Sequence, residues 1–152
     1  MRISDMLSLT WGDVYHFADG RFRSHISTSE RKTGKDRRIA LNKSMRKALD
    51  LYRKSLPEVT EEMFIFPGRG GKKPLSRCQA YRMLRSAGRA LHFETDISCH
   101  SLRKTFGYHA WKKGVQPAVL MDIFNHSSYR ITKRYLGIVQ DDIDQVFLEI
   151  NL

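Results

Sequence analysis

The sequence predicts an α+β domain that is mainly α-helical, with a small three-stranded antiparallel β-sheet near the N-terminus. Two observations support this fold class. Residues 14–41 contain strand-like runs separated by turn dipeptides, whereas most of the remaining chain has apolar residues at helical spacing. A chain of 152 residues can bury one hydrophobic core, so we expect one domain over residues 1–152.

The N-terminal third is expected to contain a helix followed by the sheet. Residues 3–11 have helical periodicity but begin almost on the first turn, so we expect a preceding element to be absent from this chain. Turn dipeptides at Asp19-Gly20 and Thr33-Gly34 divide the next segment into antiparallel strands. The predicted strands are 14–17, 22–26 and 38–41.

Capping and breaking residues predict the helices that follow. Asn42 can cap a helix that Pro57 ends, and Ser76 with Gln79 forms a capping-box pattern before a helix with an apolar side and a basic side. Gly114 ends one later helix, and Pro117 suits the first turn of the next. The later helices are expected at 101–113, 117–124, 128–135 and, as an acidic amphipathic helix, 141–150.

The charge of the chain favours a polyanionic partner. Lys and Arg total 27 against 16 Asp and Glu, a net charge of +11, so nucleic acid is the first candidate and an anionic membrane the second. No apolar run approaches the roughly 20 residues of a spanning helix, and no signal peptide is evident. Cys78 and Cys99 lack the spacing of a disulfide framework or zinc site, which fits a cytoplasmic protein without metal.

Two short segments contain residues suited to phosphate chemistry. His100 and Arg103 lie three apart at an expected helix start, so both side chains point to one side, where an imidazole and a guanidinium suit a phosphate oxyanion. Alone, this spacing also fits a solvated polar face. Downstream, a turn containing His126 precedes Tyr135 by nine residues, and Tyr129 is the other phenol nearby.

These segments resemble the active-site boxes of the tyrosine recombinase, or phage integrase, family. The family's second box is H-x-L-R, and its third ends in G-H-S-S with the nucleophilic tyrosine nine residues after that histidine. Residues 2–9, R-I-S-D-M-L-S-L, resemble the first box, and residues 31–41 resemble the β-hairpin that carries the family's lysine. The chain departs from the pattern at Ala40 and Asn125, where the family usually has proline and glycine, and the glycine before the first-box arginine is missing. Asn tolerates the left-handed backbone that such a glycine often adopts.

The resemblance implies a catalytic domain that cleaves and rejoins DNA strands through a 3′-phosphotyrosyl link, without metal, ATP or another cofactor. It also implies that the N-terminal DNA-clamping (core-binding) domain and the first catalytic-domain helix are absent from this chain. In the roles that the resemblance implies, Tyr135 is the nucleophile, and Arg2 and Arg103 would clamp the scissile phosphate. His100 would take the tyrosine proton, and His126 would donate to a nonbridging oxygen. Lys32, with Lys35 as the alternative, would protonate the leaving 5′-oxygen.

Double-stranded DNA is the partner that the resemblance implies, with a homotetramer assembled on it. The 141–150 helix would either dock on a neighbouring protomer or pack on its own domain. The basic residues expected to contact DNA, which could instead form a solvated face, are Lys35, Arg37, Arg69, Lys72, Lys73, Arg77, Arg82, Arg85 and Arg89. The parent protein would be an integrase or recombinase of a mobile element; the alternatives are a type IB topoisomerase and a non-catalytic DNA-binding remnant.

Overall fold

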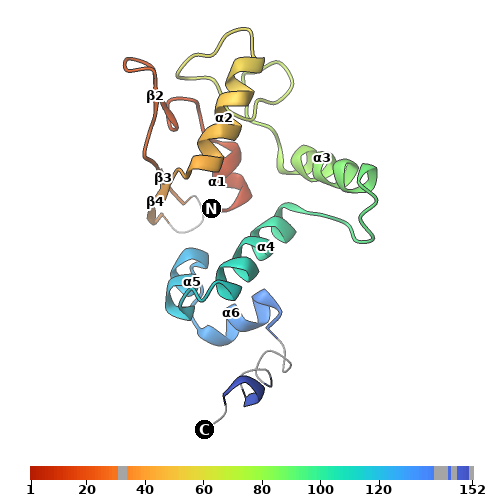
Figure 1. The fold of residues 1–152 in the computed structure, drawn as a ribbon. Coiled ribbons are helices and arrows are strands. Elements are labelled where there is room, and N and C mark those ends of the chain that lie inside the picture. Colours follow the sequence, from red (N-terminus) through yellow and green to blue (C-terminus); the bar gives the residue numbers. More distant parts are fainter. Residues whose placement is uncertain (31–33, 139–143, 145–146, 151–152) are drawn as a thin grey trace. The chain divides into compact units, whose positions relative to one another are not determined.

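The structure, a computed structural model, describes residues 1–30, 34–138, 144 and 147–150 and divides into two compact units, Met1–Met83 and Leu84–Leu152. The predicted α+β class with mainly helical content is confirmed (Figure 1). In chain order the elements are α1 (Ile3–Leu7), β1 (Tyr15–His16), β2 (Arg21–Phe22), β3 (His25–Ser29), β4 (Asp36–Ala40), α2 (Lys43–Ser55), α3 (Arg77–Ala90), α4 (Cys99–Lys112), α5 (Pro117–Phe124) and α6 (Tyr129–Leu136).

The predicted three-stranded sheet is wrong. Instead, β1 pairs with β2 and β3 pairs with β4, giving two separate two-stranded antiparallel sheets. The expected 22–26 strand is divided because consecutive residues bond to different partners. Arg23 N–H donates to the Val14 carbonyl at 2.8 Å, whereas the Ser24 carbonyl accepts from Leu41 N–H at 2.9 Å. The chain therefore leaves the first sheet at Arg23 and joins the second at Ser24.

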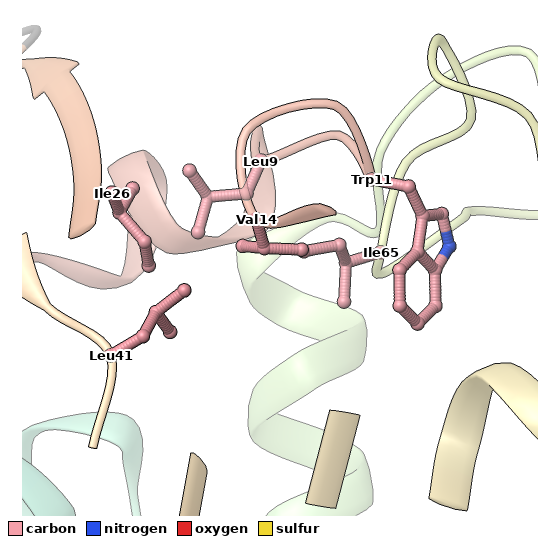
Figure 2. Packing of buried hydrophobic residues seen from close by; sticks show 6 residues of the cluster. All are labelled: Leu9, Trp11, Val14, Ile26, Leu41 and Ile65. Carbon is pink, nitrogen blue, oxygen red and sulfur yellow. The ribbon is translucent and has the colours of Figure 1, made fainter. Parts of the chain in front are cut away.

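The core of the first unit explains why α1 is shorter than predicted. After Leu7 the chain extends and pairs with a distant segment: Trp11 N–H donates to the Met63 carbonyl and Ile65 N–H to the Leu9 carbonyl, both at 2.9 Å. Figure 2 shows the buried cluster that results, formed by Leu9, Trp11, Val14, Ile26, Leu41 and Ile65. The apolar periodicity of 3–11 thus reflects burial of an extended segment as well as of a short helix.

Local capping signals are confirmed at α2 and α3. The Asn42 side chain accepts from Met45 N–H at 2.9 Å, and α2 ends with Leu56 in an extended conformation directly before Pro57, where helical geometry is disfavoured. At α3, Gln79 N–H donates to Ser76 Oγ at 3.2 Å while Gln79 Oε1 accepts from Ser76 N–H at 3.1 Å. Both helices therefore begin where their sequences predict.

In the second unit, α4, α5 and α6 contact one another (Figure 1). Their shared core contains Leu120, Phe124, Leu136 and Ile138. Gly107 on α4 permits this packing, because a Cβ at that position would lie 2.5 Å from side-chain carbons of both Phe124 and Leu136. Real side chains do not approach so closely, so α4 packs against α5 and α6 through its backbone.

Much of the predicted 141–150 helix lies outside the described residues. Residues 144 and 147–149 are helical, and the side chains of Phe147 and Leu148 are each 79% exposed. None of the helices within the described residues combines the length and the apolar character that crossing a membrane requires.

Candidate active site

The first turn of α4 positions His100 and Arg103. Ser98 caps this helix by accepting from Ser101 N–H at 3.1 Å, and Ser101 Oγ accepts from Ser98 N–H at 3.2 Å. This reciprocal cap makes α4 begin at Cys99, two residues earlier than predicted. His100 and Arg103 consequently lie on one side of the helix start, as their spacing indicated.

The turn between α5 and α6 positions His126. Asn125 ends α5 in the left-handed conformation, with φ 54° and ψ 49°, which confirms the expectation for this position. His126 N–H then donates to the Met121 carbonyl at 3.0 Å, and Ser128 caps α6 by accepting from Ile131 N–H at 3.4 Å. The chain thus reverses within four residues and presents His126 toward α6.

Aromatic rings of α4, of α5 and of the turn after α5 surround Tyr135. The ring centroid of Tyr135 lies 5.0 Å from that of His100, 5.1 Å from that of His126 and 5.1 Å from that of Phe124. Arg103 joins the cluster through Phe124, since its guanidinium carbon lies 4.9 Å from the ring centroid and its terminal nitrogen 3.4 Å from the backbone carbonyl. The structure therefore brings together His100, Arg103, His126 and Tyr135.

The phenol of Tyr135 is held in its protonated form. The phenol oxygen is buried. Among the residues that the structure describes, no group lies in hydrogen-bonding geometry to it. Burial raises the pKa of Tyr135, while the charge of Arg103 and its approach to the phenol oppose the rise. A nucleophilic role for this phenol therefore requires a group that accepts its proton, and the imidazole of His100 is a neighbour.

The environment of His126 favours a neutral ring. Burial, followed by the charge of Arg103, lowers its pKa from the usual value. Nδ1 of His126 lies 3.0 Å from Oγ1 of Thr132, a fully buried residue of α6. The ring is thereby tied to the helix that carries Tyr135.

Arg2 lies in the first unit and is held by a buried acid. Its guanidinium pairs with Oε2 of Glu30, whose side chain is 4% exposed, and Oε1 of Glu30 accepts from Nε of Arg37 at 3.1 Å. Arg37, expected to contact DNA, is thus half-buried and paired with an acid. Lys32 lies outside the described residues. Lys35 is exposed and directly precedes β4.

The remaining predicted DNA-binding residues lie on a loop and on α3. Gly68 N–H donates to the Lys73 carbonyl at 2.8 Å, and Pro67 and Pro74 form an isolated antiparallel β-bridge. These contacts close a tight loop whose basic side chains are exposed. Arg85 is paired with Asp96 at 2.8 Å, which reduces the charge that it offers to a phosphate. The exposed basic residues of the two elements are Arg69, Lys72, Lys73, Arg77, Arg82 and Arg89.

No metal site emerges among residues 1–30, 34–138, 144 and 147–150, since they contain no group of three or more His, Cys, Asp or Glu side chains arranged to hold an ion. Cys78 and Cys99 are both free thiols.

Three residues that surround the predicted groups were missed by sequence reasoning. Glu30 holds Arg2, Thr132 contacts His126, and Phe124 lies beneath Arg103. A signal existed for Thr132, because it precedes Tyr135 by three residues and so shares its helix face. Glu30 and Phe124 carried no local signal, since their contacts join residues distant in sequence.

Comparison with known proteins adds a family assignment. The family model described as the phage integrase family matches residues 1–140. A probable integrase/recombinase of Bacillus subtilis, YoeC, is 40% identical over 141 residues, covering 93% of this chain and 72% of the relative. The tyrosine recombinase XerA of Pyrococcus furiosus is 22% identical over 152 residues, covering all of this chain and 51% of the relative.

Solved structures of recombinases share the fold. The crystal structure of XerA recombinase matches with a TM-score of 0.75 at 20% identity, over 99% of this chain and 54% of that one. The XerH site-specific recombinase bound to palindromic difH substrate, a post-cleavage complex, matches with a TM-score of 0.66 at 17% identity, over 96% of this chain and 41% of that one. This chain thus spans about half the length of the XerA proteins that it matches.

Proposed function

Because this chain belongs to the phage integrase family, we propose that it is the DNA strand-cleaving and rejoining domain of a tyrosine recombinase. The observation that carries the proposal is the cluster of His100, His126 and Arg103 around Tyr135. A phenol surrounded by two imidazoles and a guanidinium suits attack on a phosphodiester, where the catalyst must supply positive donors and accept one proton.

The proposed reaction begins when the phenolic oxygen of Tyr135 attacks the scissile phosphorus. A bond forms between Tyr135 and the 3′-phosphate, and the bond from phosphorus to the 5′-oxygen breaks. His100 accepts the phenol proton, and Lys32, or Lys35 in its place, protonates the departing 5′-oxygen. Rejoining is the reverse reaction with a 5′-hydroxyl from the same or a partner duplex. The phosphotyrosyl link retains the energy of the phosphodiester bond.

Two arginines are proposed to stabilise the negative charge that develops on the nonbridging oxygens. Arg103 and Arg2 provide planar guanidinium groups, which bind phosphate through paired N–H donors. His126 adds a further hydrogen bond to one of these oxygens. The charge of Arg103 also opposes the burial that raises the pKa of Tyr135, so the same group assists formation of the nucleophile.

Double-stranded DNA is the proposed partner. The exposed basic side chains of α3 and of the 67–74 loop provide contacts to backbone phosphates, which position a duplex without reading its sequence. We further propose that the chain acts in the cytoplasm as part of a homotetramer on DNA. The exposed side chains of Phe147 and Leu148 support exchange of the C-terminal helix between protomers.

The relatives described above favour this proposal over the two alternatives. Both are named as recombinases, one of them a probable integrase/recombinase, rather than topoisomerases. A non-catalytic binding module would have no need of a buried phenol between two histidines. Strand exchange is therefore preferred to relaxation of supercoils and to binding alone.

The test is covalent trapping on a nicked suicide duplex at low salt. We expect an SDS-stable protein–DNA complex with the unmodified chain and with Tyr129→Phe, in which the exposed neighbouring phenol is removed, but not with Tyr135→Phe. Loss of the adduct in Tyr135→Phe alone assigns the nucleophile. Absence of an adduct with every protein, despite DNA binding measured by fluorescence anisotropy, contradicts the enzymatic proposal.

A further inference from the structure

Thr132 occupies a buried position between two groups of the proposed site. Its side chain is fully buried on α6, and it lies three residues before Tyr135, on the same side of the helix. Its hydroxyl oxygen contacts Nδ1 of His126, which is outside the helix in the preceding turn. A buried hydroxyl here must satisfy its hydrogen bonds within the protein.

The Thr132 hydroxyl has one proton and two acceptors within reach. Oγ1 lies 3.0 Å from Nδ1 of His126 and 3.5 Å from the carbonyl oxygen of Ser128. The second separation is at the outer limit of a hydrogen bond, whereas the first is close to the optimum. The proton is therefore directed mainly to Nδ1, although back-bonding to the carbonyl four residues earlier is common for threonine in helices.

The direction of this hydrogen bond decides what His126 can do. Burial and the nearby Arg103 lower the pKa of His126, so its imidazole is neutral near pH 7 and carries a single N–H. If Nδ1 accepts from Thr132, that N–H is at Nε2, where it can donate. If Nδ1 donates instead, Nε2 presents a lone pair, which repels a phosphate oxygen.

We propose that Thr132 is a positioning residue that donates its hydroxyl hydrogen to Nδ1 of His126 and holds the ring in the Nε2–H tautomer, ready to donate to a nonbridging phosphate oxygen. The role toward phosphate rests on the proposed function, whereas the tautomer is a property of the DNA-free protein. Because α6 carries both Thr132 and Tyr135, the same helix also sets the direction of the donor relative to the nucleophile.

The tautomer is measured directly by ¹⁵N NMR of His126 in the DNA-free chain at pH 7.5, with His126→Gln used to assign its signals. We expect a protonated Nε2 and an accepting Nδ1 in the unmodified protein and in Thr132→Ser, which retains the hydroxyl. In Thr132→Val the fixed tautomer should be lost. A protonated Nδ1 in the unmodified protein overturns the proposal, whether or not the chain cleaves DNA.

Cleavage of the suicide duplex provides the second readout. We expect the rate of adduct formation to fall about tenfold in Thr132→Val, with unchanged DNA affinity, and to be largely restored in Thr132→Ser. Thr105→Val is the control at an exposed helix position, since Thr105 Oγ1 donates to the carbonyl of Ser101 four residues earlier at 3.0 Å, the same type of bond as that from Thr132 to Ser128. A Thr132→Val protein that keeps both the Nε2–H tautomer and the rate contradicts the positioning role. Absence of an adduct with the unmodified chain bears on the proposed function alone, because the NMR result still decides the tautomer.

Discussion

The guanidinium of Arg2 is paired with the buried carboxylate of Glu30, and the same carboxylate accepts from Arg37. The long side chain of Arg2 is thereby held in a defined position. Arg2 and Arg37 are 26% and 23% exposed at their side chains, so solvent screens both pairs in part.

Glu30→Gln is expected to weaken the first unit and to release Arg2. Removing one partner of a fully buried pair costs about 3–5 kcal/mol, and partial exposure of both arginines reduces the expected loss to about 1–2 kcal/mol in the free energy of unfolding. Urea denaturation measures this change. Asp50→Asn is the control, because Asp50 forms ion pairs on the surface of α2 and its loss should leave the urea midpoint unchanged. Equal midpoints for all three proteins would show that the pair does not stabilise the fold.

His126 is expected to make the protein less stable in weak acid. Its pKa in the folded chain is lowered, so between that pKa and the usual value near 6.5 the unfolded chain binds more protons. The stabilising contribution is complete above about pH 6.5 and is lost as the pH falls through the folded pKa. Comparing urea midpoints at pH 7.5 and pH 5.0, we expect a smaller acid loss in His126→Gln than in the unmodified chain. An identical loss of stability in both proteins would show that His126 does not cause the acid sensitivity.

Asn125 is expected to tolerate glycine but not a β-branched residue. Its left-handed conformation costs little for glycine, whereas valine should lower the free energy of unfolding by about 1–2 kcal/mol. Because His126 follows directly, Asn125→Val should also slow adduct formation on the suicide duplex. Thermal unfolding and adduct rates of Asn125→Gly and Asn125→Val form the matched comparison. A valine variant as stable and as active as the glycine variant would refute this account of the turn.

The salt dependence of DNA binding is expected to separate two arginines of α3. Arg82 is exposed, whereas Arg85 is paired with Asp96. If Arg82 neutralises one phosphate, Arg82→Gln should reduce the slope of log affinity against log salt by about 0.9, with a smaller change for Arg85→Gln. Anisotropy titrations between 50 and 200 mM salt, roughly the range over which such contacts weaken, measure both slopes. An unchanged slope in Arg82→Gln would remove this helix face from the DNA-binding surface.

Features set by neighbours in sequence were predicted well. The caps at Asn42 and Ser76, the break before Pro57 and the left-handed turn at Asn125 each depend on a few adjacent residues. Local signals of this kind need no knowledge of the remaining fold. The pairing of His126 with Tyr135 came instead from the resemblance to the family, and the structure places the two ring centroids 5.1 Å apart.

Features set by distant partners could not be predicted. The 22–26 strand was expected to be continuous, but Arg23 bonds to Val14 and Ser24 to Leu41, and no local pattern distinguishes these pairings. Glu30 escaped notice for the same reason, since its partner Arg2 is 28 residues away. The residues around the proposed catalytic groups were thus harder to find than the groups themselves.

The absence of a side chain at Gly107 allows the close packing of α4 against α5 and α6 in the second unit. The helix that carries the proposed proton acceptor lies at Gly107 against side chains of Phe124 on α5 and Leu136 on the helix that carries the nucleophile, and even one methyl group on Gly107 would meet both side chains at 2.5 Å. Productive active-site geometry tolerates displacements of only about 0.5 Å. Gly107, a residue with no proposed chemical role, therefore helps to set the spacing of the helices around the proposed site, and a saturation screen for cleavage should favour glycine there.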